Sequence, residues 1–186
     1  MREFSVDNVV ALVRALFGLK KASSPLLARI KHMHRLGFPT GHFVGRGHRT
    51  SYDAEKLMQL CLAFAFIDAG LTSAHAAEIV DRHWSLIRKG MSVAAGGAQC
   101  DLIVSTGSLR ELGAPPGDGR NLDTTASLHQ IDLPSGGHAH RFTRVVLDLA
   151  TFLDAFSREV GNTIGIDVVE WSATMEKIAS GAELRS

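Results

Sequence analysis

The sequence predicts two units: a mostly α-helical N-terminal unit, residues 1–90, and a small α+β C-terminal unit, residues 100–186, joined by a linker at 91–99. Three observations support this division. Apolar residues recur at helical spacing before the linker and at strand spacing after it. The linker itself, MSVAAGGAQ, consists mainly of small residues and glycine, which is typical of a boundary. The balance of charge also changes sign across it.

The N-terminal unit is basic. Residues 1–100 contain 13 Lys and Arg against 7 Asp and Glu, whereas residues 101–186 contain 7 against 12. No acidic residue occurs between Asp7 and Asp53, and the basic residues of this stretch include Lys20, Lys21, Arg29, Lys31, Arg35, Arg46 and Arg49. A basic half beside an acidic half indicates a module that binds a polyanion, joined to something else.

Two helices open the N-terminal unit. Residues 7–17 have helical periodicity and stop at Gly18. Ser24 followed by Pro25 is a strong start signal, so a second helix runs from residue 24 to about residue 36. Its apolar side, which we expect to pack on the first helix, contains Leu26, Leu27, Ile30 and Met33. Its opposite side carries Lys31, His32 and Arg35, with Arg29 on the flank. This arrangement is a candidate helix-turn-helix.

The next stretch, residues 41–52, predicts a β-hairpin. Phe43–Val44 and Thr50–Tyr52 are compatible with strands, and Gly45–Arg46–Gly47 suits the tip because glycine adopts positive φ freely. A hairpin after a recognition helix is the wing of a winged helix. The predicted fold class is therefore a mostly α N-terminal winged helix-turn-helix with a small α+β C-terminal unit.

The remaining elements follow from periodicity and stop signals. A helix with one apolar stripe follows Tyr52 and ends at Gly70, and another runs from Thr72 or Ser73 to Gly90. The C-terminal unit then contains three strands, a helix, a short strand and a final helix, predicted at 100–106, 126–133, 141–147, 150–160, 167–170 and 172–179.

Three short motifs stand out in this part of the sequence: Arg35-Leu36-Gly37-Phe38, Gly47-His48-Arg49 with Tyr52, and Gly70-Leu71-Thr72 with Glu78-Ile79. In this order they resemble the end of the recognition helix, the wing and the last helix of the DNA-binding domain of MerR-type winged-helix regulators. The resemblance covers about residues 8–88. The resemblance implies binding of duplex DNA by a dimer, and it implies no effector.

The residues assigned to DNA contact form two groups. The recognition-helix group is Ser24, Arg29, Lys31, His32 and Arg35, where Lys31, His32 and Arg35 face the major groove and a lysine or arginine can read guanine N7 and O6. The turn and wing group is Lys20, Lys21, His42, Arg46, His48 and Arg49. Its cations neutralise phosphates, which supplies salt-dependent affinity without sequence information.

The function expected from these features is sequence-specific binding of double-stranded DNA by a bacterial-type transcriptional regulator that is not an enzyme and has no cofactor. One alternative is an excisionase-like or phage-type architectural DNA-binding protein. A lesser alternative is a small metal-dependent enzyme using His129, His138 and His140, since histidines at i and i+2 on a strand can share a metal. A further alternative is a module that binds only proteins. The basic residues that the sequence retains make this alternative less favoured.

The expected setting is a reducing cytoplasm. There is no run of eighteen apolar residues, and Cys61 and Cys100 do not make a metal or disulfide framework, so we interpret both as small buried hydrophobes. The expected partners are double-stranded DNA, a second copy in a homodimer, and a small-molecule effector or protein at the C-terminal unit, with no membrane.

Overall fold

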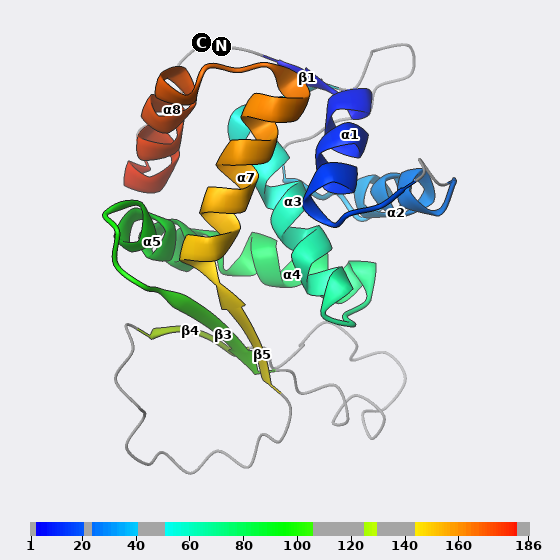
Figure 1. The fold of residues 1–186 in the computed structure, drawn as a ribbon. Helices are drawn as coiled ribbons and strands as arrows, with labels where there is room; N and C mark the ends of the chain where they lie inside the picture. Colours follow the sequence, from blue (N-terminus) through cyan, green and yellow to red (C-terminus); the bar gives the residue numbers. More distant parts are fainter. Residues whose placement is uncertain (1–2, 21–23, 41–50, 106–124, 130–143, 182–186) are drawn as a thin grey trace, which may run out of the picture.

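The computed structural model describes residues 3–20, 24–40, 51–105, 125–129 and 144–181, which form a mostly α-helical protein with two small antiparallel sheets (Figure 1). The helices are α1 (Val6–Leu16), α2 (Ser24–Arg35), α3 (Ala54–Asp68), α4 (Ser73–Arg82), α5 (Trp84–Ala95), α7 (Leu149–Ile164) and α8 (Val168–Ser180). The strands are β1 (Phe4–Ser5), β2 (Ser51–Tyr52), β3 (Asp101–Ser105), β4 (Thr125–His129) and β5 (Arg144–Asp148). Within the described ranges, none of these helices has both the length and the apolar character needed to cross a membrane.

α1 begins at a capping box that its sequence encodes locally. The Ser5 hydroxyl accepts a hydrogen bond from the backbone N–H of Asn8 at 3.2 Å, and the Asn8 side chain accepts one from the backbone N–H of Ser5 at 2.9 Å. The helix packs against α7 and α3. The helix predicted at 7–17 is confirmed, with each bound shifted by one residue.

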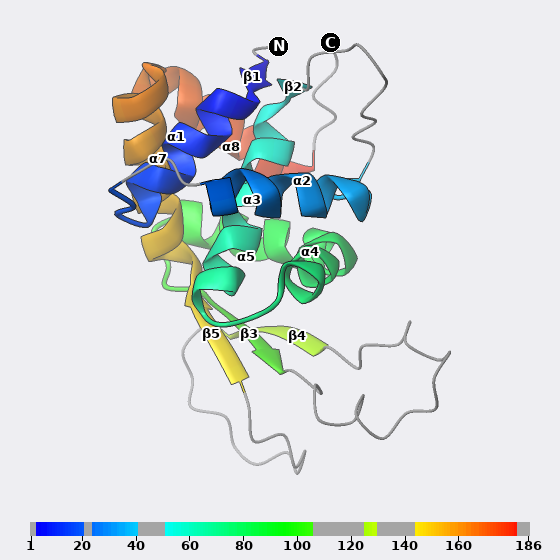
Figure 2. The same ribbon diagram turned by 90° about the vertical axis from the view of Figure 1, so that its right-hand side faces the viewer.

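α2 is the predicted second helix, and it ends where the sequence indicates. Gly37 has φ of +81°, and the backbone N–H of Phe38 bonds back to the carbonyl of Met33 at 3.0 Å. α2 contacts α4 more than it contacts α1, which corrects the expected helix pairing, and α2 and α4 are seen in Figure 2. Leu27, placed on that face by the sequence, is 37 % exposed.

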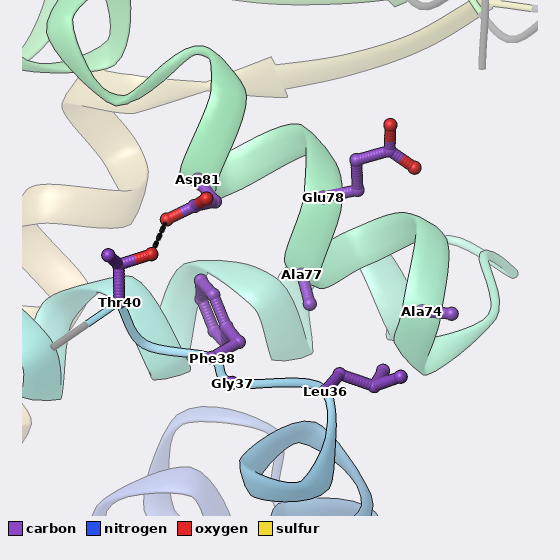
Figure 3. Close-up of a pocket in the computed structure, with 8 residues that line it drawn as sticks. All are labelled: Leu36, Gly37, Phe38, Thr40, Ala74, Ala77, Glu78 and Asp81. Atoms are coloured by element: carbon purple, nitrogen blue, oxygen red, sulfur yellow. Dashed lines mark hydrogen bonds between the residues drawn. The ribbon is translucent and has the colours of Figure 1, made fainter. Parts of the chain in front are cut away.

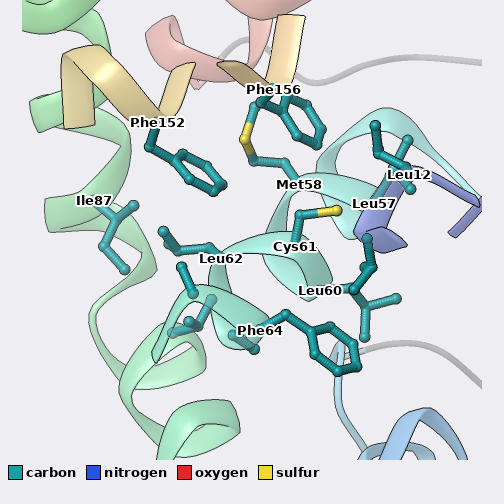
Figure 4. Packing of buried hydrophobic residues seen from close by; sticks show 14 of the residues in the cluster. Leu12, Leu57, Met58, Leu60, Cys61, Leu62, Phe64, Ile87, Phe152 and Phe156 are labelled. Atoms are coloured by element: carbon teal, nitrogen blue, oxygen red, sulfur yellow. The ribbon is translucent and has the colours of Figure 1, made fainter. Parts of the chain in front are cut away.

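α3 is the central helix of the fold. Asp53 caps its start by accepting a hydrogen bond from the backbone N–H of Lys56 at 2.7 Å. Every residue from Leu57 to Phe66 is buried, because α1, α4 and the C-terminal helices surround α3 (Figure 4). The single apolar stripe expected from the sequence is thus one part of a helix buried on nearly all sides, as a helix apolar all round should be.

The predicted helix from Thr72 to Gly90 is two helices in the structure. α4 is capped by Thr72 and ends at His83, and α5 continues through Gly90 to Ala95. Gly90 does not stop α5, because burial along one helix face outweighs the roughly 1 kcal/mol cost of an interior glycine. The predicted linker at 91–99 therefore begins inside α5.

The three predicted strands of the C-terminal unit form one sheet in the order β4-β3-β5. Both pairings are antiparallel, with Ile103 opposite Ser127 on one side and Val146 on the other. Leu102 and Val104 of the middle strand are buried. α5 and α7 contact the sheet, so its alternation of buried and open positions matches a sheet covered on one face.

α8 begins where the sequence predicts a strand at 167–170. The Asp167 carboxylate accepts hydrogen bonds from the backbone N–H groups of Val169 and Glu170 at 2.8 and 3.4 Å, and so caps a helix. The strand prediction was wrong because the Asp167 cap stabilises the start of a helix. This effect outweighs the strand preference of the two valines that follow. The final helix consequently starts four residues earlier than the predicted range of 172–179.

The C-terminal helices fold back onto the N-terminal ones. α7 packs against α1 and α5, and α8 packs against α5 (Figure 1). Phe4 of β1 meets Trp171 of α8 edge-to-face, with ring centroids 6.4 Å apart. Buried residues from both predicted units form one hydrophobic cluster. The boundary between units at 1–90 and 100–186 stays a prediction, and the core spans it.

The predicted wing is described only at its C-terminal end. Ser51–Tyr52 is a strand, and its partner is β1, with Tyr52 opposite Phe4. Phe43–Val44, the expected partner, lies outside the described residues together with the rest of 41–50. The mostly α character of the N-terminal unit is confirmed, and its assignment as a winged helix-turn-helix stays a prediction.

Candidate nucleic-acid interface

The exposed face of α2 carries the residues predicted for base recognition. All five of them are exposed in the structure: Ser24, Arg29, Lys31, His32 and Arg35. The opposite face is at most 3 % exposed and consists of Leu26, Ile30 and Met33. At 100° per residue, four of the five, Ser24, Lys31, His32 and Arg35, fall within about 100° of arc, and Arg29 lies toward the flank. The helix therefore gathers these polar side chains on one exposed face, which also contains Ala28.

This face is positively charged. α2 contains Arg29, Lys31 and Arg35 and no acidic residue. Among the described residues, the ion pairs lie on or beside α3, α4 and α7, and none of them involves these three cations. The positive charge of α2 is thus not neutralised within the helix itself, and an external anion can approach it.

A partly buried hydrogen bond holds the last turn of α2 to β2. The Tyr52 hydroxyl and His34 Nε2 are 2.7 Å apart, and the two rings lie 5.7 Å apart at a tilt of 33°. Tyr52 is 1 % exposed, and burial raises the pKa of its phenol well above the usual range. Tyr52 is matched to the wing by the resemblance, but in the structure it faces the core and does not reach solvent.

Sequence reasoning missed this pair. His34 lies beside the apolar stripe of α2 on the helical wheel, and Tyr52 is the only tyrosine of the chain. The one signal in the sequence that could have indicated this hydrogen bond is a single tyrosine beside a stretch rich in histidine.

A groove opens between the end of α2 and α4 (Figure 3). Its volume is about 330 Å³, and its lining is Leu36, Gly37, Phe38, Thr40, Ala74, Ala77, Glu78 and Asp81. Thr40 donates a hydrogen bond from Oγ1 to the Asp81 carboxylate across it. Two carboxylates line this groove beside the basic face of α2, and that of Glu78 is paired with Arg82 of the same helix.

The turn and wing residues are described in part. Lys20 is exposed, and its carbonyl accepts a hydrogen bond from Arg14 Nη2 at 3.2 Å, which ties the turn to α1. The other five residues of this group, Lys21, His42, Arg46, His48 and Arg49, lie outside the described residues.

The metal-enzyme alternative is described at one of its three residues. His129 is the last residue of β4, opposite Asp101 of β3, and His138 and His140 lie outside the described residues. Within the described part of the chain, no group of three or more His, Cys, Asp or Glu side chains is placed to hold a metal ion.

The two cysteines are buried and free, as the sequence predicted. Burial raises the pKa of the Cys61 thiol far above its usual range, and burial with the carboxylates of Asp101 and Asp148 raises the pKa of Cys100. A thiol held protonated is a poor nucleophile and metal ligand, which fits a packing role for both.

Comparison with known proteins returns no match to a family model, to a curated protein or to a solved structure.

Proposed function

We propose that this protein binds double-stranded DNA through α2, which enters the major groove with its exposed face toward the base edges. The observation that supports this most is the division of α2 into a buried apolar face and an acid-free basic face. A helix of 12 residues is about 18 Å long and, with its side chains, matches a groove about 12 Å wide.

The side chains of α2 differ in what they do in this proposal. Lys31 and Arg35 donate hydrogen bonds to base acceptors, above all to guanine O6 and N7. Ser24 and His32 donate to phosphate or base acceptors, and Arg29 on the flank reaches a phosphate. Lys20, in the turn before α2, neutralises a phosphate and carries no sequence information.

The wing is the second part of the proposal. Lys21, His42, Arg46, His48 and Arg49 are predicted to lie along the phosphate backbone, and the resemblance to MerR-type regulators favours this arrangement. The same resemblance favours a homodimer that acts as a cytoplasmic transcriptional regulator. An effector or protein partner then acts on the C-terminal part of the chain.

Selection of bound duplexes from a random pool at low salt tests the proposal directly. We expect enrichment of one motif, repeated as two half-sites if the protein is a dimer. The logarithm of the affinity for the enriched duplex should fall linearly with the logarithm of the salt concentration, because counterions are released from phosphates. The proposal fails if the folded protein retains no duplex at low salt. A bending assay on the enriched duplex separates a regulator from the architectural alternative.

A further inference from the structure

Base recognition requires a fixed rotation of α2 about its own axis. Side-chain tips lie about 5 to 6 Å from a helix axis, so a rotation of 20° moves them by about 2 Å. A hydrogen bond to a base edge does not survive such a displacement. Close packing of the three buried residues of α2 limits this rotation, and directional hydrogen bonds narrow it further.

Two directional hydrogen bonds flank Arg35 along the chain. On one side, His34 bonds to Tyr52 of β2, with His34 Nε2 and the Tyr52 hydroxyl 2.7 Å apart. On the other side, the chain leaves α2, and Thr40 bonds to Asp81 of α4 (Figure 3). The first bond connects the last turn of α2 to the strand β2. The second connects the segment that follows α2 to the helix α4.

We propose that His34–Tyr52 and Thr40–Asp81 are positioning pairs of the DNA interface, which fix the rotation of α2 so that Lys31 and Arg35 point at base edges. This inference rests on the proposed binding of DNA by α2. Tyr52 is 1 % exposed and acts without touching DNA. Thr40 and Asp81 are exposed, and the carboxylate of Asp81, which accepts the Thr40 hydrogen bond, disfavours a phosphate beside them. The pairs affect discrimination between sequences more than affinity for DNA in general.

The test compares two duplexes of equal length, one enriched by selection and one with the same bases scrambled. The variants are Tyr52→Phe, Thr40→Val and the double variant, and binding is measured by fluorescence anisotropy with the full chain. Loss of both hydrogen bonds should weaken binding to the enriched duplex by about tenfold, and binding to the scrambled duplex by less than about twofold.

Thr151→Val is the matched control. Thr151 Oγ1 donates to Asp148 at 2.7 Å at the start of α7, so the substitution removes the same type of hydroxyl–carboxylate bond far from α2. The control should leave the ratio of the two affinities unchanged. Melting temperatures of all variants identify any general loss of structure, and if Tyr52→Phe does not fold, Thr40→Val alone carries the comparison.

A double-mutant cycle separates positioning from a general effect. With Lys31 and Arg35 both replaced by alanine, the double variant should lose less than about twofold further affinity for the enriched duplex, since the contacts to be positioned are already gone. An unchanged ratio of affinities in the double variant, or a full tenfold further loss in the background without Lys31 and Arg35, overturns the inference. A wild-type chain that binds neither duplex instead removes the proposed function itself.

Discussion

Arg35 lies in the middle of the exposed face of α2, in its last turn and next to His34. Arginine can donate two hydrogen bonds to guanine, and a good bidentate pair contributes about 1–3 kcal/mol of discrimination. Arg35→Ala should therefore weaken binding to the preferred duplex by about that amount and change binding to a scrambled duplex little.

Arg158→Ala on α7 is the matched control for this prediction. Arg158 is an exposed arginine that pairs with Asp154 at 3.5 Å, away from α2. Its loss should leave both affinities as they are. Equal weakening of both duplexes by Arg35→Ala would show that Arg35 contacts phosphate and not base edges.

Lys20, in contrast to Arg35, is proposed to contact phosphate and not base edges. It is exposed in the turn between α1 and α2, where a lysine acts as a point charge toward phosphate. Lys20→Ala should weaken binding to all duplexes alike and reduce the slope of log affinity against log salt by about one. Titrations at several salt concentrations measure both quantities. An unchanged slope would place Lys20 outside the interface.

At the scale of the element, α7 depends on the side chain of Asp148. Its carboxylate accepts hydrogen bonds from the backbone N–H of Thr151 at 3.0 Å and from the Thr151 hydroxyl at 2.7 Å. These bonds, with a smaller contribution from Ala150, hold the pKa of Asp148 below its usual value. The stability that they provide is present above the pKa of the unfolded chain, about 3.9, and is lost as the pH falls through the lowered pKa of the folded state.

Asp148→Ala should accordingly lower the free energy of unfolding by about 1 kcal/mol at neutral pH, the usual value of an N-cap. The difference from the wild type should shrink as the pH falls below 4, since the wild-type carboxyl then also becomes protonated. Chemical denaturation of both proteins at several pH values measures this. Asp154→Ala, in the middle of α7 and not at its cap, is the control and should behave like the wild type throughout. A constant difference at all pH values would assign the effect of Asp148→Ala to something other than its charge.

Helix starts were predictable where a cap is encoded by adjacent residues. The sequence predicts the start of α4 at Thr72 or Ser73, and Thr72 is its cap in the structure. Asp167 was not recognised, because two valines after it favour a strand when they are considered without the cap. The continuation of α5 through Gly90 was not predictable either, since it depends on partners in α7 and α8 that lie far along the chain. Local sequence signals therefore predict where the helices occur, whereas packing against distant segments determines how long they are.

The candidate interface was likewise predictable only in part. The wheel of α2 identified its exposed residues, since an apolar stripe defines the opposite face without knowledge of its partner. The same wheel did not identify α4 as that partner, nor the bonds of His34 and Thr40. Those depend on residues 18 and 41 positions further along the chain.

At the scale of the whole molecule, the N-terminal helices share one hydrophobic core with α7 and α8. α7 is the chief packing partner of α1, and Phe156 and Val160 of α7 are fully buried in the shared cluster. A fragment of residues 1–99 loses these side chains and exposes the face that they cover. Removal of one buried phenylalanine side chain alone costs about 3–5 kcal/mol, which is comparable to the stability of a small domain.

The fragment should thus show no cooperative thermal transition, and it should not bind the duplex enriched by the full chain. Circular dichroism during heating measures the first, and anisotropy measures the second. A cooperative transition with native-like helix content would instead support a DNA-binding unit that folds independently, as the charge division of the sequence suggests.

The contact between Phe4 and Trp171 has a consequence for the newly made chain. A ribosome adds about 5–20 residues per second, so roughly 7 to 30 seconds separate the synthesis of α2 from that of α8. During that interval the N-terminal helices exist without the part of the shared core that α7 and α8 complete. The proposed ability to bind DNA specifically is therefore complete only after α8 has left the ribosome.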